Sequence, residues 1–269
     1  PRIQRTASDA TSRSPMSERL AAPPGYSSIA LLDRQRHRER GVAPRVARFA
    51  ATLHAVYLTL PEFVAASRTL PIVFSQAEDQ TWQPLAVTGL EPGRNLCVDA
   101  AGDWAADSYC PAYVRRYPFC TARVRADGTR MQSVICVDEA GLGPAPPHLF
   151  DARGEPTPRW QELQRFIEEV DAAMGQTEGF CAVLADLDLL EPFEADVNPA
   201  RGNPKRVTGM WRVVEARLNA LEPATLLRLM QQGYLSRIYA HLMSLDNFQR
   251  LLEADVVRAR AAAESSGAA

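Results

Sequence analysis

Lysine is almost absent from this chain. Lys205 is the only one among the 30 basic residues, and the others are arginines. We interpret this shortage as base-composition bias in the coding DNA rather than as selection for bidentate chemistry. The 32 acidic residues bring the formal net charge to −2. Because a nucleic-acid-binding surface leaves a basic excess, this balance argues against a nucleic-acid partner.

Paired cysteines are also missing. No Cys-x-x-Cys occurs, so neither a zinc ribbon nor a thioredoxin-type site is predicted. We expect buried free thiols, as is usual in a reducing compartment. The five cysteines are Cys97, Cys110, Cys120, Cys136 and Cys181.

Long apolar stretches do not occur either. No run approaches the ~20 residues that a helix needs to cross a bilayer. The polar start of the chain lacks the apolar core of a secretory signal. We therefore predict a soluble, cytoplasmic protein with no membrane span.

The common catalytic signatures are absent too. There is no Gly-x-Ser-x-Gly, no phosphate-binding glycine loop, and no metal-ligand spacing among the four histidines. We therefore predict no cofactor and no metal site. His241 lies in an apolar helical pattern, which favours a hydrogen-bonded core or interface histidine. An acidic cluster is interpreted as a solvated face, with a weak divalent-ion site as the alternative. Its members are Asp186, Asp188, Glu191, Glu194 and Asp196.

The first half of the chain has the pattern of short strands. Alternating and β-branched segments predict strands at 72–74, 85–89 and 95–99, and a hairpin that joins 119–125 to 131–137. Asp127-Gly128 marks the reversal of the hairpin, because this dipeptide favours tight turns. Five prolines and three glycines in 141–158 predict a connector.

The second half has helical periodicity. Apolar residues at helical spacing predict helices within 163–174 and 180–190, the latter ending at Glu191-Pro192, and four more helices after a polar loop at 198–204. The prediction is an α+β fold with an N-terminal antiparallel β-rich half and a C-terminal helical half. We divide the chain into a disordered arm (1–25), a β-rich core (26–158), a helical region packed on that core (159–262) and a disordered tail (263–269).

Residues 107–119, which we call the aromatic–arginine segment, combine tyrosines, two adjacent arginines and two prolines. Rings and guanidinium groups offer large contact areas at low conformational cost, which suits recognition. The candidate ligand- or partner-binding residues in and beside it are Trp104, Tyr109, Tyr113, Arg115, Arg116 and Tyr117. In the alternative, the rings pack a sheet against helices and the arginines pair with Asp99, Asp103 or Asp107.

A series of short motifs resembles the SapC family of bacterial proteins. The series runs through Leu70-Pro-Ile-Val-Phe74, Asp103-Trp104, Tyr109-Cys-Pro-Ala-Tyr-Val-Arg-Arg-Tyr-Pro-Phe119, Cys136-Val-Asp138 and Ala240-His-Leu-Met-Ser-Leu245. The resemblance implies a bacterial protein often encoded beside TonB-dependent outer-membrane receptors and flavin-dependent halogenase-like enzymes. It supplies no established catalytic residues. Cys97 and Cys110 depart from the family pattern and are interpreted as core substitutions.

Three functions remain open on the sequence. The first is a non-catalytic accessory or recognition protein of a peptide- or nutrient-related locus, whose protein or peptide partner is a halogenase-like enzyme or an uptake-locus protein. The second is a metal-dependent oxygenase or hydrolase acting on a peptide or carbohydrate, with His54, Glu62, Tyr113 and Arg115 in its active site. The third is a structural surface-layer component, suggested by the family name alone.

Overall fold

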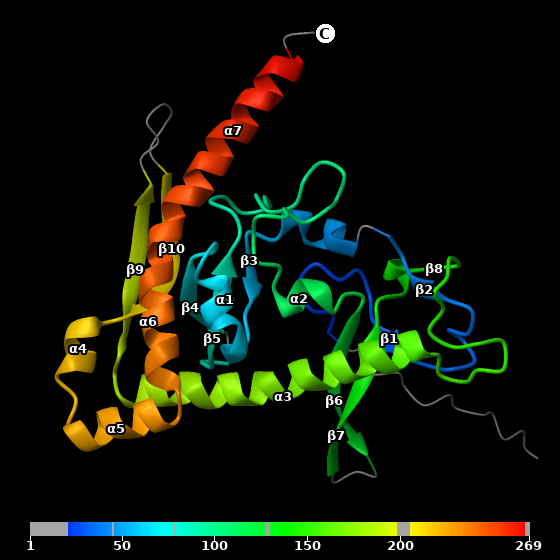
Figure 1. Ribbon diagram of the computed structural model, residues 1–269, viewed down its shortest axis with the longest axis horizontal. Coiled ribbons are helices and arrows are strands. Elements are labelled where there is room, and N and C mark those ends of the chain that lie inside the picture. Colours follow the sequence, from blue (N-terminus) through cyan, green and yellow to red (C-terminus); the bar gives the residue numbers. More distant parts are fainter. Residues whose placement is uncertain (1–20, 45, 78, 127–129, 198–204, 267–269) are drawn as a thin grey trace, which may run out of the picture.

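Figure 1 shows an elongated α+β molecule, as predicted, with two sheets set apart along its length. The computed structural model describes residues 21–44, 46–77, 79–126, 130–197 and 205–266. The predicted reversal at Asp127-Gly128, the loop at 198–204 and residues 1–20 of the predicted arm lie outside the described residues.

Short strands and helices alternate before a long central helix. The strands are β1 (Ala30–Leu31), β2 (Gly41–Val42), β3 (Ala55–Tyr57), β4 (Ile72–Gln76), β5 (Trp82–Val87), β6 (Phe119–Ala126), β7 (Arg130–Val137), β8 (Leu142–Gly143), β9 (Leu190–Val197) and β10 (Lys205–Val213). The α-helices are α1 (Phe63–Ala66), α2 (Ala112–Arg115), α3 (Pro158–Asp186), α4 (Glu215–Asn219), α5 (Pro223–Gln231), α6 (Tyr234–Ser244) and α7 (Phe248–Ser266). The 3₁₀ turns within the described residues are η1 (Val46–Thr52), η2 (Leu60–Glu62), η3 (Glu139–Gly141) and η4 (Leu245–Asn247).

The larger sheet has five antiparallel strands in the order β3-β5-β4-β10-β9. Its last two strands come from the second half of the chain, and β10 joins β4 where Trp211 lies opposite Phe74. The predicted strands at 72–74 and 85–89 correspond to β4 and β5, although β5 begins and ends earlier than predicted. A sheet that needs β9 and β10 is completed only when both halves of the chain are present.

The predictions for residues 95–99 and 187–190 are wrong. Residues 95–99 form turns rather than a strand, because the Asn95 side chain donates to Ala50 O at 2.9 Å and accepts from Cys97 N at 2.7 Å. Residues 187–190 do not continue the helix: α3 ends at Asp186 and β9 begins at Leu190. Proline is tolerated in β9 because this strand lies at the edge of the sheet, where a missing N–H breaks no ladder.

The second sheet has three strands in the order β1-β7-β6, and a further, two-stranded sheet pairs β2 with β8. The predicted hairpin is confirmed, with β6 and β7 paired from Phe119 opposite Val137 to Ala126 opposite Arg130. Cys120 lies directly opposite Cys136. The five cysteines are free thiols, four of them buried, as expected.

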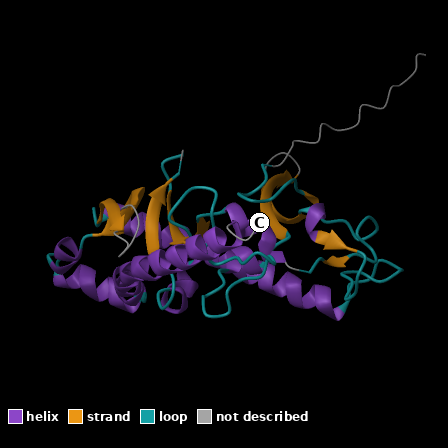
Figure 2. Ribbon diagram, turned by 90° about the horizontal axis from the view of Figure 1, so that it is seen from above, coloured by secondary structure: helices purple, strands orange, loops and turns teal. Residues whose placement is uncertain are grey.

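The helix α3 connects the two sheets. It is one helix of 29 residues, about 43 Å long, where the sequence predicted two shorter ones. It begins at Pro158, where the Thr157 side chain accepts from Trp160 N at 3.2 Å, and it contacts both β5 and β6. Figures 1 and 2 show α3 running along the molecule from one sheet to the other.

The larger sheet and the C-terminal helices enclose an aromatic core. Phe63, Phe74 and Phe180 are fully buried and in mutual ring contact. His241 from α6 lies against Phe74; Val213 N donates to its Nε2 at 3.1 Å, and its Nδ1 is 2.8 Å from Ile72 O. The prediction of a hydrogen-bonded core histidine is therefore confirmed.

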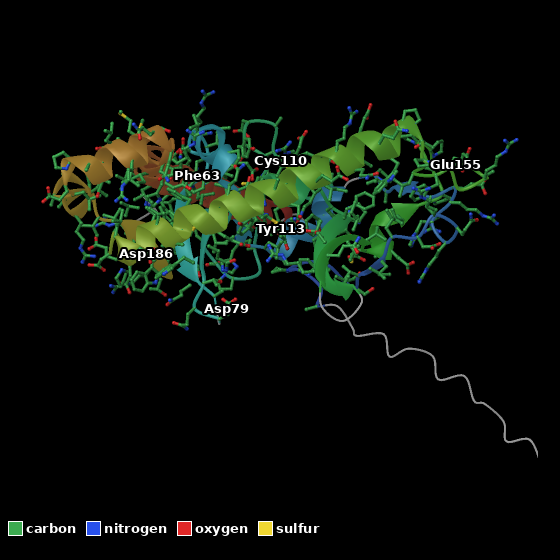
Figure 3. The ribbon with its side chains drawn as sticks, turned by 90° about the horizontal axis from the view of Figure 1, so that it is seen from below. Phe63, Asp79, Cys110, Tyr113, Glu155 and Asp186 are labelled. Atoms are coloured by element: carbon green, nitrogen blue, oxygen red, sulfur yellow. The ribbon has the colours of Figure 1, made fainter. Side chains whose placement is uncertain are left out.

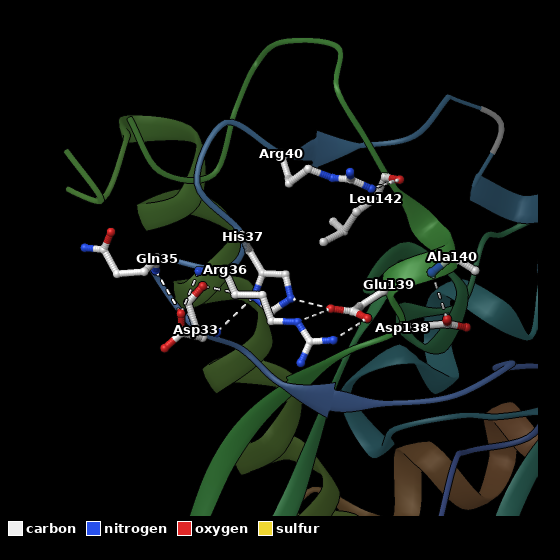
Figure 4. Close-up of polar contacts among 9 residues, drawn as sticks. All are labelled: Asp33, Gln35, Arg36, His37, Arg40, Asp138, Glu139, Ala140 and Leu142. Carbon is white, nitrogen blue, oxygen red and sulfur yellow. Dashed lines mark hydrogen bonds and ion pairs between the residues drawn. The ribbon is translucent and has the colours of Figure 1, made fainter. Parts of the chain in front are cut away.

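A second buried histidine fastens the loop after β1. Figure 4 shows His37 between the backbone of Asp33 and the carboxylate of Glu139, with Nε2 3.0 Å from Oε1. Arg36 also reaches Glu139, and Arg40 donates to Leu142 O at 3.1 Å. We interpret this cluster as a clamp that joins two loops. None of the described helices is long and apolar enough to cross a membrane.

Candidate functional site

The aromatic–arginine segment folds as a single helical turn between irregular stretches. Pro111 precedes α2, and Arg116 follows its last residue with helical dihedral angles. Consecutive residues on a helix point about 100° apart, so the two arginines leave the backbone in different directions. They consequently reach different surroundings.

A buried carboxylate holds the start of this helix. Glu62, 6% exposed, accepts from Tyr109 OH at 3.0 Å and from Ala112 N at 2.6 Å through Oε1. Its Oε2 accepts from the backbone and hydroxyl of Thr59. Both carboxylate oxygens of Glu62 are therefore already hydrogen-bonded within the protein.

Arg115 is the exposed member of the pair. Its guanidinium lies 3.9 Å from Glu62 Oε1 and 5.0 Å from the centroid of the Phe166 ring on α3. Its Nε donates to Cys110 O at 3.0 Å. Arg115 thus has a carboxylate, a ring and a carbonyl as partners at the surface.

Arg116 is buried, with only 5% of its surface exposed. Its guanidinium lies 5.2 Å from the Tyr113 ring centroid, and Nη1 donates to Met174 Sδ at 3.5 Å. Its Nε is buried without a hydrogen-bond partner. Among the described residues, no carboxylate forms an ion pair with Arg116. A buried cation without a counter-ion is costly, so this residue is the most unusual feature of the segment.

Arg116 and Tyr113 line a cavity of about 800 Å³ between the two sheets. The strands β3 and β5, the loop between β4 and β5, the strand β6, and one face of α3 form its walls. Figure 3 shows Tyr113 in the middle of the molecule and Asp79 in the loop that joins β4 to β5. The lining residues used below are Tyr57, Asp79, Trp82, Arg123, Glu178 and Cys181.

Charge and burial differ between the floor and the edge of the cavity. Arg116, Tyr113 and Cys181 are buried, whereas Asp79, Arg123 and Glu178 are exposed. Burial raises the pKa of Tyr57 to about 12, with Glu178 acting in the same direction and Arg116 opposing it. Burial also raises the pKa of Tyr113, again opposed by Arg116. Both phenols are therefore neutral hydrogen-bonding groups at neutral pH.

The six candidate residues do not form one surface. Only Tyr113 and Arg116 are found among the described residues that line the cavity. Tyr117 stacks on Phe49 at 4.0 Å, and its hydroxyl lies 3.4 Å from Asp138 Oδ2. Trp104 pairs with Val98 through an isolated bridge, and its indole nitrogen is buried without a partner. Tyr109 and Arg115 belong to the Glu62 cluster.

The residues of the predicted alternatives are brought together only in part: Glu62 and Arg115 lie 3.9 Å apart. Arg115 and Arg116 do not pair with Asp99, Asp103 or Asp107; Asp107 instead lies 3.9 Å from Arg250. His54 is exposed, whereas Glu62 is buried. The described residues contain no group of three or more His, Cys, Asp or Glu side chains that could hold a metal ion. In the acidic cluster, three carboxylates pair with arginines: Asp188 with Arg217, Glu191 with Arg212, and Glu194 with Arg206.

Sequence reasoning missed most of the cavity lining. Tyr57, Trp82 and Glu178 lie on different elements, separated by up to about 120 residues of chain, and no local motif connects them. The sequence links only two of the lining residues, and only by their spacing. Met174 and Glu178 are four residues apart on one helix and so lie on one face.

Comparison with known proteins gives a family. The SapC family profile matches residues 32–251, which include the aromatic–arginine segment, the strands β2 to β10 and most of the helices. No curated protein and no solved structure matches the chain. Because the match covers most of the sequence, the chain belongs to the SapC family.

Proposed function

We propose that this chain is a recognition protein that binds an organic anion in the cavity between its sheets, with Arg116 as the anion receptor. The observation that carries the proposal is the buried guanidinium of Arg116, which lacks a carboxylate partner and lies against an open volume of about 800 Å³. The ligand is a small molecule or a terminus of a peptide or protein partner.

The energetics of burial support an anionic ligand. A buried cation loses its hydration, and the neutral groups beside Arg116 are weak replacements for it: the Tyr26 phenol, the Tyr113 ring and the Met174 sulfur. A carboxylate or phosphate that met the guanidinium would provide charge-assisted hydrogen bonds and a counter-charge together. The binding energy would therefore include relief of an unfavourable feature of the empty protein.

The walls of the cavity favour a ligand with an apolar body. Tyr57, Trp82 and Tyr113 present rings, and Leu53, Leu85 and Met174 present aliphatic or thioether surface. A cavity of this size, with mostly apolar walls and a few polar groups, is typical of small-molecule and peptide sites. The exposed edge, with charges of both signs, leaves room for polar parts of the ligand.

Cys181 at the floor of the cavity does not suit nucleophilic catalysis. Burial raises the pKa of this thiol to about 12, so it stays protonated at neutral pH. A reactive cysteine needs the thiolate form and therefore a lowered pKa. This supports binding over thiol chemistry at the site.

Replacing Arg116 tests the proposal. In ligand-free protein, Arg116→Met removes an uncompensated buried charge, so we expect the melting temperature to rise by a few degrees. Benzoate, N-acetylphenylalanine and inorganic phosphate serve as anion probes. Their binding is measured by thermal shift and by calorimetry. At least one of them should stabilise the wild-type protein, with an affinity that falls at least tenfold in Arg116→Met.

Arg115→Met is the matched control, because it removes the same charge from the neighbouring, exposed position. Its anion affinity should stay within about threefold of wild type, since Arg115 lies outside the described cavity lining. The proposal is overturned if no probe binds the wild-type protein, or if Arg115→Met and Arg116→Met weaken binding equally.

A further inference from the structure

We infer that the ligand is a zwitterion, an amino acid or short peptide, whose ammonium group is held by Glu178 while Arg116 holds its carboxylate. This inference rests on the proposed function and names the chemical class of the ligand. The observations that carry it are two opposite charges that line one cavity without pairing with each other.

Arg116 and Glu178 both lie beside α3 at the cavity. Arg116 contacts α3 at Met174, where Nη1 lies 3.5 Å from Sδ. Glu178 follows Met174 by four residues on the same face of α3, a rise of about 6 Å. Tyr57, Arg116 and Glu178 line the same cavity. The pKa of the Tyr57 phenol is raised mainly by burial, and Glu178 raises it further while Arg116 lowers it.

This separation suits an α-amino acid or the end of a peptide. The carboxylate and ammonium of a free amino acid are attached to one carbon, and a hydrogen bond of about 2.9 Å at each end extends their combined reach. The two charged groups and their hydrogen bonds together span a distance comparable to one turn of α3. A peptide would place its carboxylate on Arg116 and direct a basic side chain or its amino end to Glu178.

The other charged side chains of the cavity are compatible with a ligand that carries both a positive and a negative charge. Asp79 lies at the exposed edge, and its hydrogen bonds from Thr81 hold the pKa of the carboxyl below its usual range. Arg123, on β6, is exposed and also lines the cavity. A simple monoanion at Arg116 would be repelled by Glu178, whereas a zwitterion offers each protein charge an opposite partner. From Coulomb's law in a partly hydrated site, we expect the Kd of the zwitterion to be roughly tenfold lower than that of the monoanion.

Calorimetry with three related probes tests the inference. Phenylalanine carries both charges, N-acetylphenylalanine only the carboxylate, and phenethylamine only the ammonium; the shared ring suits the walls formed by Tyr57, Trp82 and Tyr113. For wild-type protein we expect phenylalanine, or the Phe-Phe dipeptide, to bind about tenfold tighter than the same compound with its amine acetylated. Tighter binding of the dipeptide identifies a peptide site, and the reverse order identifies an amino-acid site.

Glu178→Gln should abolish the preference for the free amine, because it removes the ammonium partner and keeps the side-chain shape. Glu169→Gln is the matched control, since Glu169 is also exposed on α3 but is not among the described lining residues. It should retain the preference. The inference is overturned if neither phenylalanine nor Phe-Phe binds, or if Glu178→Gln leaves the ratio of free to acetylated ligand unchanged.

The outcomes also separate this inference from the proposed function. If Arg116→Met weakens binding of N-acetylphenylalanine while Glu178→Gln changes no ratio, the anion site stands and the zwitterion assignment fails. If Arg116→Met leaves the affinity for every probe unchanged, both fail.

Discussion

At the scale of the residue, two adjacent arginines have contrasting surroundings. Arg115 lies at the surface with Glu62, Phe166 and a carbonyl as partners, whereas Arg116 is buried beside a cavity with an unpartnered Nε. The cause is the helical turn of α2, which directs consecutive side chains to different neighbours. Composition alone does not distinguish the two arginines; their surroundings give Arg115 partners at the surface and leave Arg116 buried beside the cavity.

Burial also determines the protonation of His241. Its Nδ1–H donates to Ile72 O and its Nε2 accepts from Val213 N, so the neutral ring already uses both nitrogens. Burial lowers the pKa of His241 from 6.5 to about 4. The folded protein therefore binds fewer protons than the unfolded chain between these two values.

We expect the free energy of unfolding to fall as the pH drops from 6.5 to 4. The folded-state pKa is depressed, so this contribution is fully present above pH 6.5 and is lost by about pH 4, a change of roughly 3 kcal/mol. Urea titrations at several pH values would measure it. His241→Gln should flatten the slope in this window, and exposed His54→Gln should leave it intact. Equal slopes in wild type and His241→Gln would contradict the assignment.

At the scale of the element, α3 organises the candidate site. Its buried face packs Ile167, Phe180 and Leu184 into the core, and its residues Met174, Glu178 and Cys181 line the cavity. One rigid helix thereby fixes the distance between the sheets that form the opposite walls. The helix is stabilised at its start by Thr157 and Pro158, a favourable pair at an N-terminus.

Two glycines inside α3 provide a test of this element. A Cβ at Gly175 or Gly179 would meet no atom within 4 Å, so alanine fits without strain. Because glycine costs helix stability, Gly175→Ala and Gly179→Ala should each stabilise the protein by about 0.5–1 kcal/mol. Thermal unfolding would measure the gain. Gly89→Ala is the contrasting variant: its Cβ would lie 1.9 Å from Arg94 O, so it should destabilise, and stabilisation by Gly89→Ala would refute the packing described.

At the scale of the whole molecule, the two halves of the chain share one sheet and one core. The strands β9 and β10 extend the sheet begun by β3, β4 and β5, and α6 places His241 against Phe74. The long helix α7 returns to the loop after β5, where Arg258 donates to the carbonyls of Asn95 and Val98. The predicted division at residue 158 stays a prediction, and these contacts across it make independent folding of the first part unfavourable.

A fragment of residues 21–158 should therefore not fold alone. It leaves β4 without β10 and exposes Phe63 and Phe74 to water where Phe180 now packs. Losing several such contacts, at about 3–5 kcal/mol for a buried aromatic ring, consumes the 5–15 kcal/mol by which domains are usually stable. Circular dichroism during urea titration would show no cooperative transition. A cooperative transition would establish the first part as an autonomous domain.

The sequence alone determined what depends on neighbouring residues. Alternation predicted the hairpin of β6 and β7, helical spacing predicted most of α3 and the helices after β10, and ordered motifs predicted the family. These features are encoded locally, in periods of two or about four residues. Of the candidate site residues, Tyr113 and Arg116 border the cavity, and the role of the segment in binding stays a prediction.

Only the tertiary structure decided the rest. The placement of β9 at the sheet edge, the burial of Arg116 and the gathering of Tyr57, Trp82 and Glu178 around one volume depend on contacts between distant segments. A proline that argues against a central strand is acceptable at an edge, and an arginine that is usually solvated is buried where other elements enclose it. Such outcomes are set by which surfaces pack together, and no short-range pattern in a single sequence records that choice.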